Sequence, residues 1–426
     1  MQRVRLRRAL GVLAAAVLVG AQATIAALAG AGPGGQLPPP TPVGPNASPS
    51  PFVTTLHTPA DTSAEPAIAA ASAILADLDT GQVLLAKNPD AQRPIASVTK
   101  IMTALLVLRR TTPGQTVTVS ATAAAPEGSN GLSELGLEEG ERITVGELTW
   151  ALLVQSANDA AIALAEHVAG TQARFVKAMN AVAGRLGLRH TEFRSPNGLD
   201  DRGHSSARDL VTLTRAAFNE DPRFGAIIGT REHDVPSPEG EARHIQNRNV
   251  LLWLYRGATG VKTGYTSSAG FCMVATAQRE GRRLIAVVLG EPGEPFSDAA
   301  ALLNYGFDAF EEHTFVDPGE SFGEVDIRGG SVPVATSQGL VALVPTAAIG
   351  NARRLVSVDP EAAFPPAPGE QVATLRVSIP GHPLGSVPLL VIDVPAPPPV
   401  DDRPWWSRAA SSVGGAVSGA LGAFVG

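Results

Sequence analysis

The stretch that most constrains this chain is a serine placed one helical turn before a lysine. The run from Pro94 to Leu106 carries apolar side chains at the spacing of a helix that buries one face. Ser97 stands where that helix should begin, and Lys100 shares its first turn. A neutral lysine amine can take the proton of a serine, and the positive end of the helix dipole disfavours protonation of that amine. The pair therefore predicts a nucleophilic serine.

Lysine usage strengthens this interpretation. The chain has 33 lysines and arginines, of which the only lysines are Lys87, Lys100, Lys177 and Lys262. Arginine stays protonated in proteins, whereas lysine can lose its proton. A lysine kept at position 100 is therefore informative, although Ser-x-x-Lys alone is also typical of a helix cap followed by a surface lysine.

Two further motifs accompany this pair. Ser156-Ala157-Asn158 falls in a turn between two predicted helices, where a hydroxyl and an amide could meet a peptide. Lys262-Thr263-Gly264 continues a strand-like alternation; its ammonium and hydroxyl suit a carboxylate, and Gly264 allows another backbone to approach closely. Since no Gly-x-x-x-x-Gly-Lys run precedes Lys262, a phosphate-binding loop is excluded.

In this order the three motifs are the set of penicillin-binding proteins and class A β-lactamases. The chain resembles the D-alanyl-D-alanine carboxypeptidases among the low-molecular-mass penicillin-binding proteins. Further stretches carry the resemblance, namely Ser156 to Ala160, Asn197-Gly198-Leu199, Asn247 to Trp253 and Lys262 to Thr266. It covers about residues 68–310 and, less firmly, 312–395.

The resemblance implies a role for each residue on the reacting side. Ser97 would be the acyl-enzyme nucleophile and Lys100 its general base, although the base is disputed among related enzymes. Ser156 would help relay the proton to the leaving amine, and Asn158 would hold the amide on the acyl side of the substrate.

The resemblance also implies a binding side. Lys262 and Thr263, with Arg248, would bind the terminal carboxylate of the substrate. The backbone N–H groups of Ser97 and Tyr265 would form the oxyanion hole. Gly264, which stands between Thr263 and Tyr265 in the chain, belongs to the same substrate-binding set.

The resemblance implies an α+β fold of the β-lactamase and DD-peptidase type. We expect an antiparallel sheet flanked by helices, with an all-helical lobe, over residues 66–311, and a small all-β domain over residues 312–397. Residues 72–78 and 82–86 predict a hairpin, the apolar runs 271–277 and 283–290 predict buried strands, and residues 299–310 predict a closing helix.

The two ends of the chain differ in composition from this core. Residues 1–31 combine a basic start, an apolar middle and small residues, which is typical of a secretory signal. Residues 32–65 are a linker rich in proline. Residues 398–426 contain Trp405-Trp406 followed by small and apolar residues, and predict either a membrane-associated or a disordered tail. We therefore expect an extracytoplasmic protein with peripheral membrane contact.

Charge and composition limit the kinds of partner and ligand that the chain is expected to bind. The formal net charge is −7, and loss of Arg3, Arg5, Arg7 and Arg8 with the signal would give −7 − 4 = −11. Such an acidic chain is a poor candidate for nucleic-acid binding. We expect no cofactor, and no metal because the eight histidines lack ligand spacing. The single cysteine, Cys272, is expected in the core. The partners implied by the resemblance are peptidoglycan stem peptides, with β-lactam antibiotics as inhibitors.

The leading hypothesis is a serine carboxypeptidase that removes the terminal D-alanine from peptidoglycan pentapeptides. A DD-endopeptidase remains an alternative because the same groups could cut cross-links. A class A β-lactamase is disfavoured because no Glu-x-x-Leu-Asn run lies between the second and third motifs. An inactive, muropeptide-binding scaffold on the same fold is the non-enzymatic alternative.

Overall fold

The computed structural model describes residues 56, 61–125, 133–238, 240–380 and 382–393. The predicted signal segment, most of the proline-rich linker and the predicted membrane-associated tail lie outside the described residues. The chain divides into two compact units, one reaching Glu311 and including Leu343–Thr346, the other formed by the rest from Glu312 onward. Among the residues described, no helix is both long enough and apolar enough to span a membrane.

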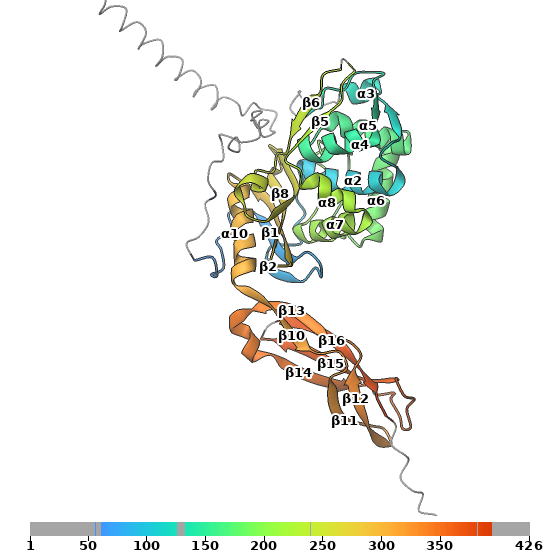
Figure 1. Cartoon of the computed structure of the whole chain (residues 1–426), viewed down its shortest axis with the longest axis vertical. Coiled ribbons are helices and arrows are strands. Elements are labelled where there is room, and N and C mark those ends of the chain that lie inside the picture. Colours follow the sequence, from blue (N-terminus) through green and yellow to red (C-terminus); the bar gives the residue numbers. More distant parts are fainter. Residues whose placement is uncertain (1–55, 57–60, 126–132, 239, 381, 394–426) are drawn as a thin grey trace, which may run out of the picture. The chain divides into compact units, whose positions relative to one another are not determined.

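A five-stranded antiparallel sheet in the order β2-β1-β9-β8-β7 is the centre of the first unit (Figure 1). The strands come from both ends of the unit: β1 (Ser72–Asp77), β2 (Val83–Lys87), β7 (Ala258–Thr266), β8 (Gly270–Arg279) and β9 (Arg282–Glu291). The predicted hairpin is confirmed as β1 and β2, and the two predicted buried strands as β8 and β9. The strand β7, which carries Lys262-Thr263-Gly264, lies at one edge.

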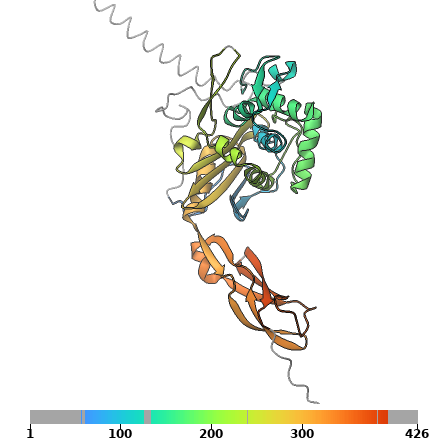
Figure 2. The same ribbon diagram turned by 45° about the vertical axis from the view of Figure 1, so that its right-hand side comes forward.

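Both faces of this sheet are buried, which explains the near-continuous apolar runs. Along β1, Ile74 joins the core on the side of the helical lobe and Leu75 joins a second core on the opposite side. The helix α10 (Pro295–Asp308) packs on the second face, and α7 (Ala207–Glu220) packs on the first (Figure 2). The closing helix therefore begins earlier than predicted, at Pro295, and ends before Phe310, which opens the next strand.

The helical lobe is built from the middle of the first unit. It contains α2 (Lys100–Arg110), α3 (Ala121–Ala124), α4 (Val145–Trp150), the π-helical turn η2 (Ala151–Gln155), α5 (Asn158–Ala169), α6 (Gln172–Arg185), α7 and α8 (Pro222–Ile228). The short helix α9 (Leu251–Leu254) belongs instead to the second core, with α10. Thr144 caps α4 as its spacing from Glu147 predicts, since its hydroxyl accepts a bond from Glu147 N. The Glu147 carboxylate, however, lies 3.0 Å from His233 Nε2 and does not complete a capping box.

Two short hairpins also belong to this unit. The first is β3 (Thr116–Thr118) with β4 (Arg142–Thr144), and the second is β5 (Glu232–Val235) with β6 (Arg243–Gln246). The sequence predicts a strand at β3 but neither strand of the second hairpin, whose polar residues do not follow a clean alternation.

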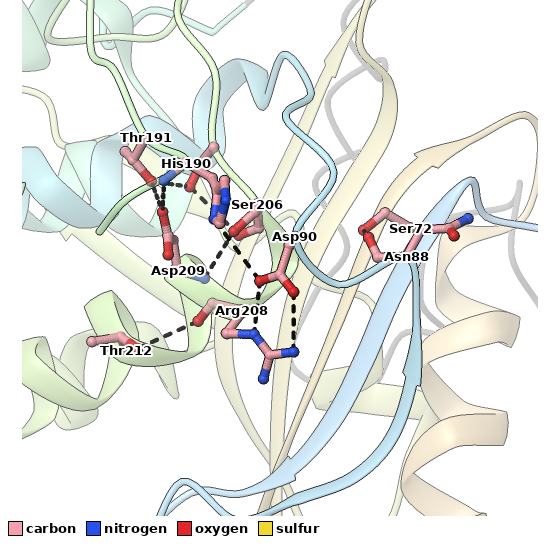
Figure 3. A network of polar contacts seen from close by, with 10 residues as sticks. Ser72, Asn88, Asp90, His190, Thr191, Ser206, Arg208, Asp209 and Thr212 are labelled. Atoms are coloured by element: carbon pink, nitrogen blue, oxygen red, sulfur yellow. Dashed lines mark hydrogen bonds and ion pairs between the residues drawn. The ribbon is translucent and has the colours of Figure 1, made fainter. Parts of the chain in front are cut away.

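A polar network fixes the start of α7 (Figure 3). The Ser206 hydroxyl caps the helix by accepting a bond from Asp209 N. The Asp209 carboxylate in turn accepts bonds from His190 N at 2.8 Å and Thr191 Oγ1 at 2.7 Å. Beside it, Arg208 pairs with Asp90 across 118 residues of chain. The network therefore joins the start of this helix to two preceding loops.

The second unit is all-β. A five-stranded antiparallel sheet has the order β11-β12-β16-β15-β14, formed by Ser321–Ile327, Gly330–Thr336, His382–Val391, Gln371–Ile379 and Arg353–Val358. The strands β10 (Phe310–Val316) and β13 (Leu340–Pro345) form a two-stranded sheet, and the 3-10 helix η3 (Thr346–Asn351) follows β13. Short apolar runs at 332–335, 339–344, 354–358 and 373–379 predict the strands β12 to β15. A further predicted strand at 389–394 covers only the end of β16, and β10 and β11 are missed.

Candidate active site

Ser97 lies in a single turn of 3-10 helix, η1 (Ala96–Thr99), that leads into α2. The sequence predicts an α-helix from this point, whereas the structure begins it at Lys100. Ala96, just before the serine, has a φ of 46°, a left-handed conformation that is uncommon for residues with a side chain. Backbone strain of this kind is concentrated at functional sites. The Ser97 side chain is 5% exposed, so it is accessible only through the pocket described below.

Lys100 is fully buried and contacts three oxygen atoms. Its Nζ lies 2.8 Å from Ser97 Oγ, 2.8 Å from Asn158 Oδ1 and 2.9 Å from the carbonyl oxygen of Asn197. An amide oxygen and a backbone carbonyl can only accept hydrogen bonds. A neutral amine has two N–H groups for these two acceptors, which leaves its lone pair for the Ser97 hydroxyl.

The surroundings favour this neutral amine. Burial lowers the pKa of Lys100 well below its ordinary value, and the positive charges of Lys262 and Arg248 lower it further, while Asp159 acts in the opposite direction. The sequence predicts the same direction from the helix dipole. In the folded protein, removal from water is the largest of the causes named above.

The second motif lies at the end of η2. Ser156 has a φ of 68° and is buried, and its Oγ has no hydrogen-bond partner among the described residues. A buried hydroxyl without a partner is costly unless a ligand or water satisfies it. Asn158, two residues later, is completely buried and presents its Oδ1 to Lys100.

The third motif brings the edge strand β7 against η1. A side-chain carbon placed at Gly264 would lie 2.9 Å from Ser97 N and 3.0 Å from the carbonyl oxygen of Ile95. This confirms the close approach that the sequence predicts for Gly264. The two backbones can meet here only because position 264 has no side chain.

Two further basic side chains, Lys262 and Arg248, are buried at the site. Lys262 Nζ donates to the carbonyl oxygen of Thr263 at 2.9 Å, and burial together with Arg248 lowers the pKa of Lys262 to about 7. Arg248 Nε donates to the carbonyl oxygen of Gln155 at 2.9 Å, and burial lowers the pKa of Arg248 to about 10. Concentrating positive charge away from water is unfavourable, and such arrangements cluster at sites that bind or react.

One pocket collects most of the predicted site residues. It is lined by Ser97, Ser133, Ser156, Arg248, Thr263, Gly264 and Tyr265. Lys100, Asn158 and Lys262 are not among these residues and are buried. Asn158, through its Oδ1, contacts Lys100, and Lys262 contacts the Thr263 carbonyl oxygen.

Sequence reasoning did not assign a role to two parts of the site. One is Ser133, which lines the pocket, and the other is the carbonyl of Asn197, which accepts a bond from Lys100. A backbone carbonyl has no side-chain signature in a sequence. The only local signal is the Pro196-Asn197-Gly198 turn; Gly198 has a φ of 85°, and a side-chain carbon there would lie 2.0 Å from the Ala96 carbonyl oxygen.

Comparison with known proteins agrees with this geometry. The family model for D-alanyl-D-alanine carboxypeptidases matches residues 59–293, more than half of the chain. The chain belongs to the D-alanyl-D-alanine carboxypeptidase family. Within that family, the carboxypeptidase DacD of Escherichia coli is 38% identical over 308 residues, which are 69% of this chain and 78% of that protein. DacF of Bacillus subtilis is 32% identical over 329 residues, 75% of this chain and 84% of that protein.

A solved structure of the family shares the fold. Penicillin-binding protein 6B from Escherichia coli is 33% identical, with a TM-score of 0.63, over 79% of this chain and 99% of that one. The predicted DD-peptidase fold and the resemblance stated from the motifs are therefore confirmed. The match favours the carboxypeptidase over the class A β-lactamase alternative.

Proposed function

We propose that this carboxypeptidase removes the terminal D-alanine from peptidoglycan pentapeptides through an acyl-enzyme on Ser97, and that penicillins acylate the same serine. The observation that carries the proposal is the set of contacts around Lys100. In the neutral amine that burial favours, the two oxygens that can only accept hold both N–H groups, and the lone pair is left for Ser97 Oγ, 2.8 Å away.

In the acylation step, Lys100 Nζ takes the proton of Ser97 while Oγ forms a bond to the carbonyl carbon of the penultimate D-alanine. The backbone N–H groups of Ser97 and Tyr265 stabilise the negative oxygen that develops. When the carbon–nitrogen bond breaks, the leaving amine receives the proton from Lys100 through the Ser156 hydroxyl. A water molecule then hydrolyses the ester, and Ser97 regains its proton.

The terminal carboxylate of the substrate needs a positive partner within the pocket. Arg248 and Thr263 line the pocket and are the groups proposed to bind it. Lys262, whose Nζ donates to the carbonyl oxygen of Thr263, is proposed to bind the carboxylate with them. Asn158 holds Lys100 in place, and binds the substrate amide only if its side chain turns when the substrate enters.

The place of action is proposed from the ends of the chain. The basic and apolar residues 1–31 would direct export, so the enzyme would act on peptidoglycan outside the cytoplasm. Residues 398–426, with Trp405-Trp406, would provide peripheral membrane contact.

The test combines a label and a product. Wild-type protein should become covalently labelled by a fluorescent penicillin and should release D-alanine from a pentapeptide, and Ser97→Ala should do neither. Equal labelling of the two proteins would refute the assignment of the nucleophile. Conversion of cross-linked dimers to monomers, with no release of D-alanine from the pentapeptide, would identify an endopeptidase instead.

A further inference from the structure

The carboxylate of Asp159 lies one residue after the Asn158 that contacts Lys100, and the proposed chemistry does not use it. It is 1% exposed and accepts four backbone N–H groups. Leu135 N and Ala160 N bond Oδ1 at 3.0 and 2.8 Å, while Gly136 N and Leu137 N bond Oδ2 at 2.9 and 3.1 Å. Three of the four donors belong to one loop.

That loop, residues 133–137, has further attachments to the Ser156-Ala157-Asn158 turn. Asn158 N donates to the carbonyl oxygen of Ser133 at 2.6 Å. Gln155 Nε2 donates to the carbonyl oxygen of Glu134 at 2.6 Å. The loop therefore begins at a residue of the substrate pocket, Ser133, and is held along its length by residues 155–159.

We propose that Asp159 is a positioning residue, which fixes loop 133–137 so that Ser133 stays in the substrate pocket and which places a negative charge behind Lys100. The inference rests on the proposed function, because it concerns the same pocket and the same base. Only a carboxylate offers enough acceptor sites for four N–H groups without bringing a donor of its own. An asparagine of the same shape would present an NH₂ group to at least one of these N–H groups.

The charge of Asp159 acts within a defined group of neighbours. Lys100 on α2 is the base, and Lys262 on β7 and Arg248 before α9 lower its pKa, whereas Asp159 raises it. The negative charge of Asp159 also helps to raise the pKa of Arg243 of β6, whose Nη1 lies 2.7 Å from Glu141 Oε1. Removing the Asp159 charge therefore lowers the pKa of Lys100, while the other charged groups remain in place.

The experiment uses the full-length protein and compares Asp159→Asn with wild type. We expect kcat/KM for a D-Ala-D-Ala peptide to fall about 10- to 100-fold, since displacement of a positioning group by about 1 Å costs that much. The acidic limb of the pH profile of kcat/KM should move to lower pH. A thermal unfolding curve on each protein verifies that the variant is folded.

Two further variants separate the effects. Gln155→Ala removes a loop attachment without changing charge, so kcat/KM should fall about fivefold with the acidic limb unmoved. Asp209→Asn is the matched control, because Asp209 is also buried and also accepts a backbone N–H, at His190, outside the pocket (Figure 3). It should lower the melting temperature and leave the pH profile unchanged.

A folded Asp159→Asn protein with wild-type kcat/KM and an unmoved acidic limb would overturn the proposal, as would one that loses only stability, like Asp209→Asn. If Asp159→Asn does not fold, Gln155→Ala decides, and wild-type kcat/KM in that variant refutes the role of the loop. A wild-type protein that released no D-alanine would instead refute the proposed function itself.

Discussion

At the scale of single residues, the site depends on burying groups that ordinarily stay in water. Lys100 is completely buried, and Lys262 and Arg248 are nearly so. Isolated buried charges are strongly unfavourable, so burial lowers the pKa of each of these three groups and favours its neutral form. For Lys100 the lowered pKa has a use, because it increases the fraction of neutral amine, which is the form that can serve as a base. For Arg248, with a pKa still at about 10, the charge remains available to bind an anion.

The first prediction concerns Lys100→Arg, which keeps the positive charge and removes a proton acceptor. Acylation by a fluorescent penicillin should slow by about 10²- to 10⁴-fold, the range of general-base catalysis. In the wild type, the rate should fall as the pH drops through the lowered pKa of Lys100, because protonation occupies the lone pair. Stopped-time labelling from pH 5 to 9 measures both effects. Lys177→Arg, at an exposed lysine of α6, is the control and should label normally.

At the scale of elements, the site forms where the edge strand β7 meets the 3-10 turn η1 that precedes α2. Neither β7 nor η1 carries a complete active site. The strand supplies Thr263 and Gly264, and the 3-10 turn supplies Ser97 together with its backbone N–H. Their contact depends on the missing side chain at position 264, since any Cβ there would lie within about 3 Å of the turn.

The second prediction is that Gly264→Ala separates these two elements. The added methyl group pushes η1 away from β7, so the rate of penicillin acylation should fall about 100-fold, as expected when a reacting group is displaced by about 1 Å. The matched control is Gly184→Ala in α6, where nothing lies within 4 Å of the added carbon. That variant should keep full activity and gain about 0.4–1 kcal/mol in the free energy of unfolding. Equal activity of the two variants would contradict the proposed contact.

At the scale of the whole molecule, the segment just before β1 is tied to α10, near the end of the first unit. Asp298 in α10 accepts a bond from Ala70 N at 3.0 Å. Burial and, to a smaller extent, the Glu291 carboxyl raise the pKa of Asp298 from 3.8 to about 6. The folded state therefore holds this proton more tightly than the unfolded state. The contribution to stability is complete below about pH 4 and is lost as the pH rises through about 6.

The third prediction concerns how the stability gained by replacing Asp298 depends on pH. Asp298→Asn should raise the melting temperature by about 2–4 °C at pH 7.5, about 1 kcal/mol for a unit of this size, and should change it little at pH 4.5. Asp90→Asn is the control with the opposite sign, since Arg208 lowers the pKa of Asp90 and its carboxylate stabilises the fold at neutral pH. Calorimetry of both variants at the two pH values measures the difference. A gain for Asp298→Asn at pH 4.5 alone would show that the assumed protonation is wrong.

The sequence by itself determined the local features. Spacing was enough to predict the pairing of Ser97 with Lys100, the hairpin of β1 and β2 and the buried strands β8 and β9, because each depends on residues near one another in the chain. The missing side chain at Gly264 predicted a close approach there, but not that the approaching backbone is that of Ser97. The sequence analysis misplaced α10 and missed β10, β11 and the β5–β6 hairpin. The apolar periodicity of these segments is weak, so their structure depends on packing with the rest of the protein.

Only the tertiary structure decided how the motifs act together. It brings Ser97, Ser156 and Thr263 to one pocket, buries Lys100 and Lys262, and presents the Asn197 carbonyl to Lys100. The burial of Lys100 is the largest of the causes that lower the pKa of the base. These facts depend on residues as far apart in the chain as Ser97 and Thr263, and removal from water is a property of the packed molecule that no short stretch of sequence contains.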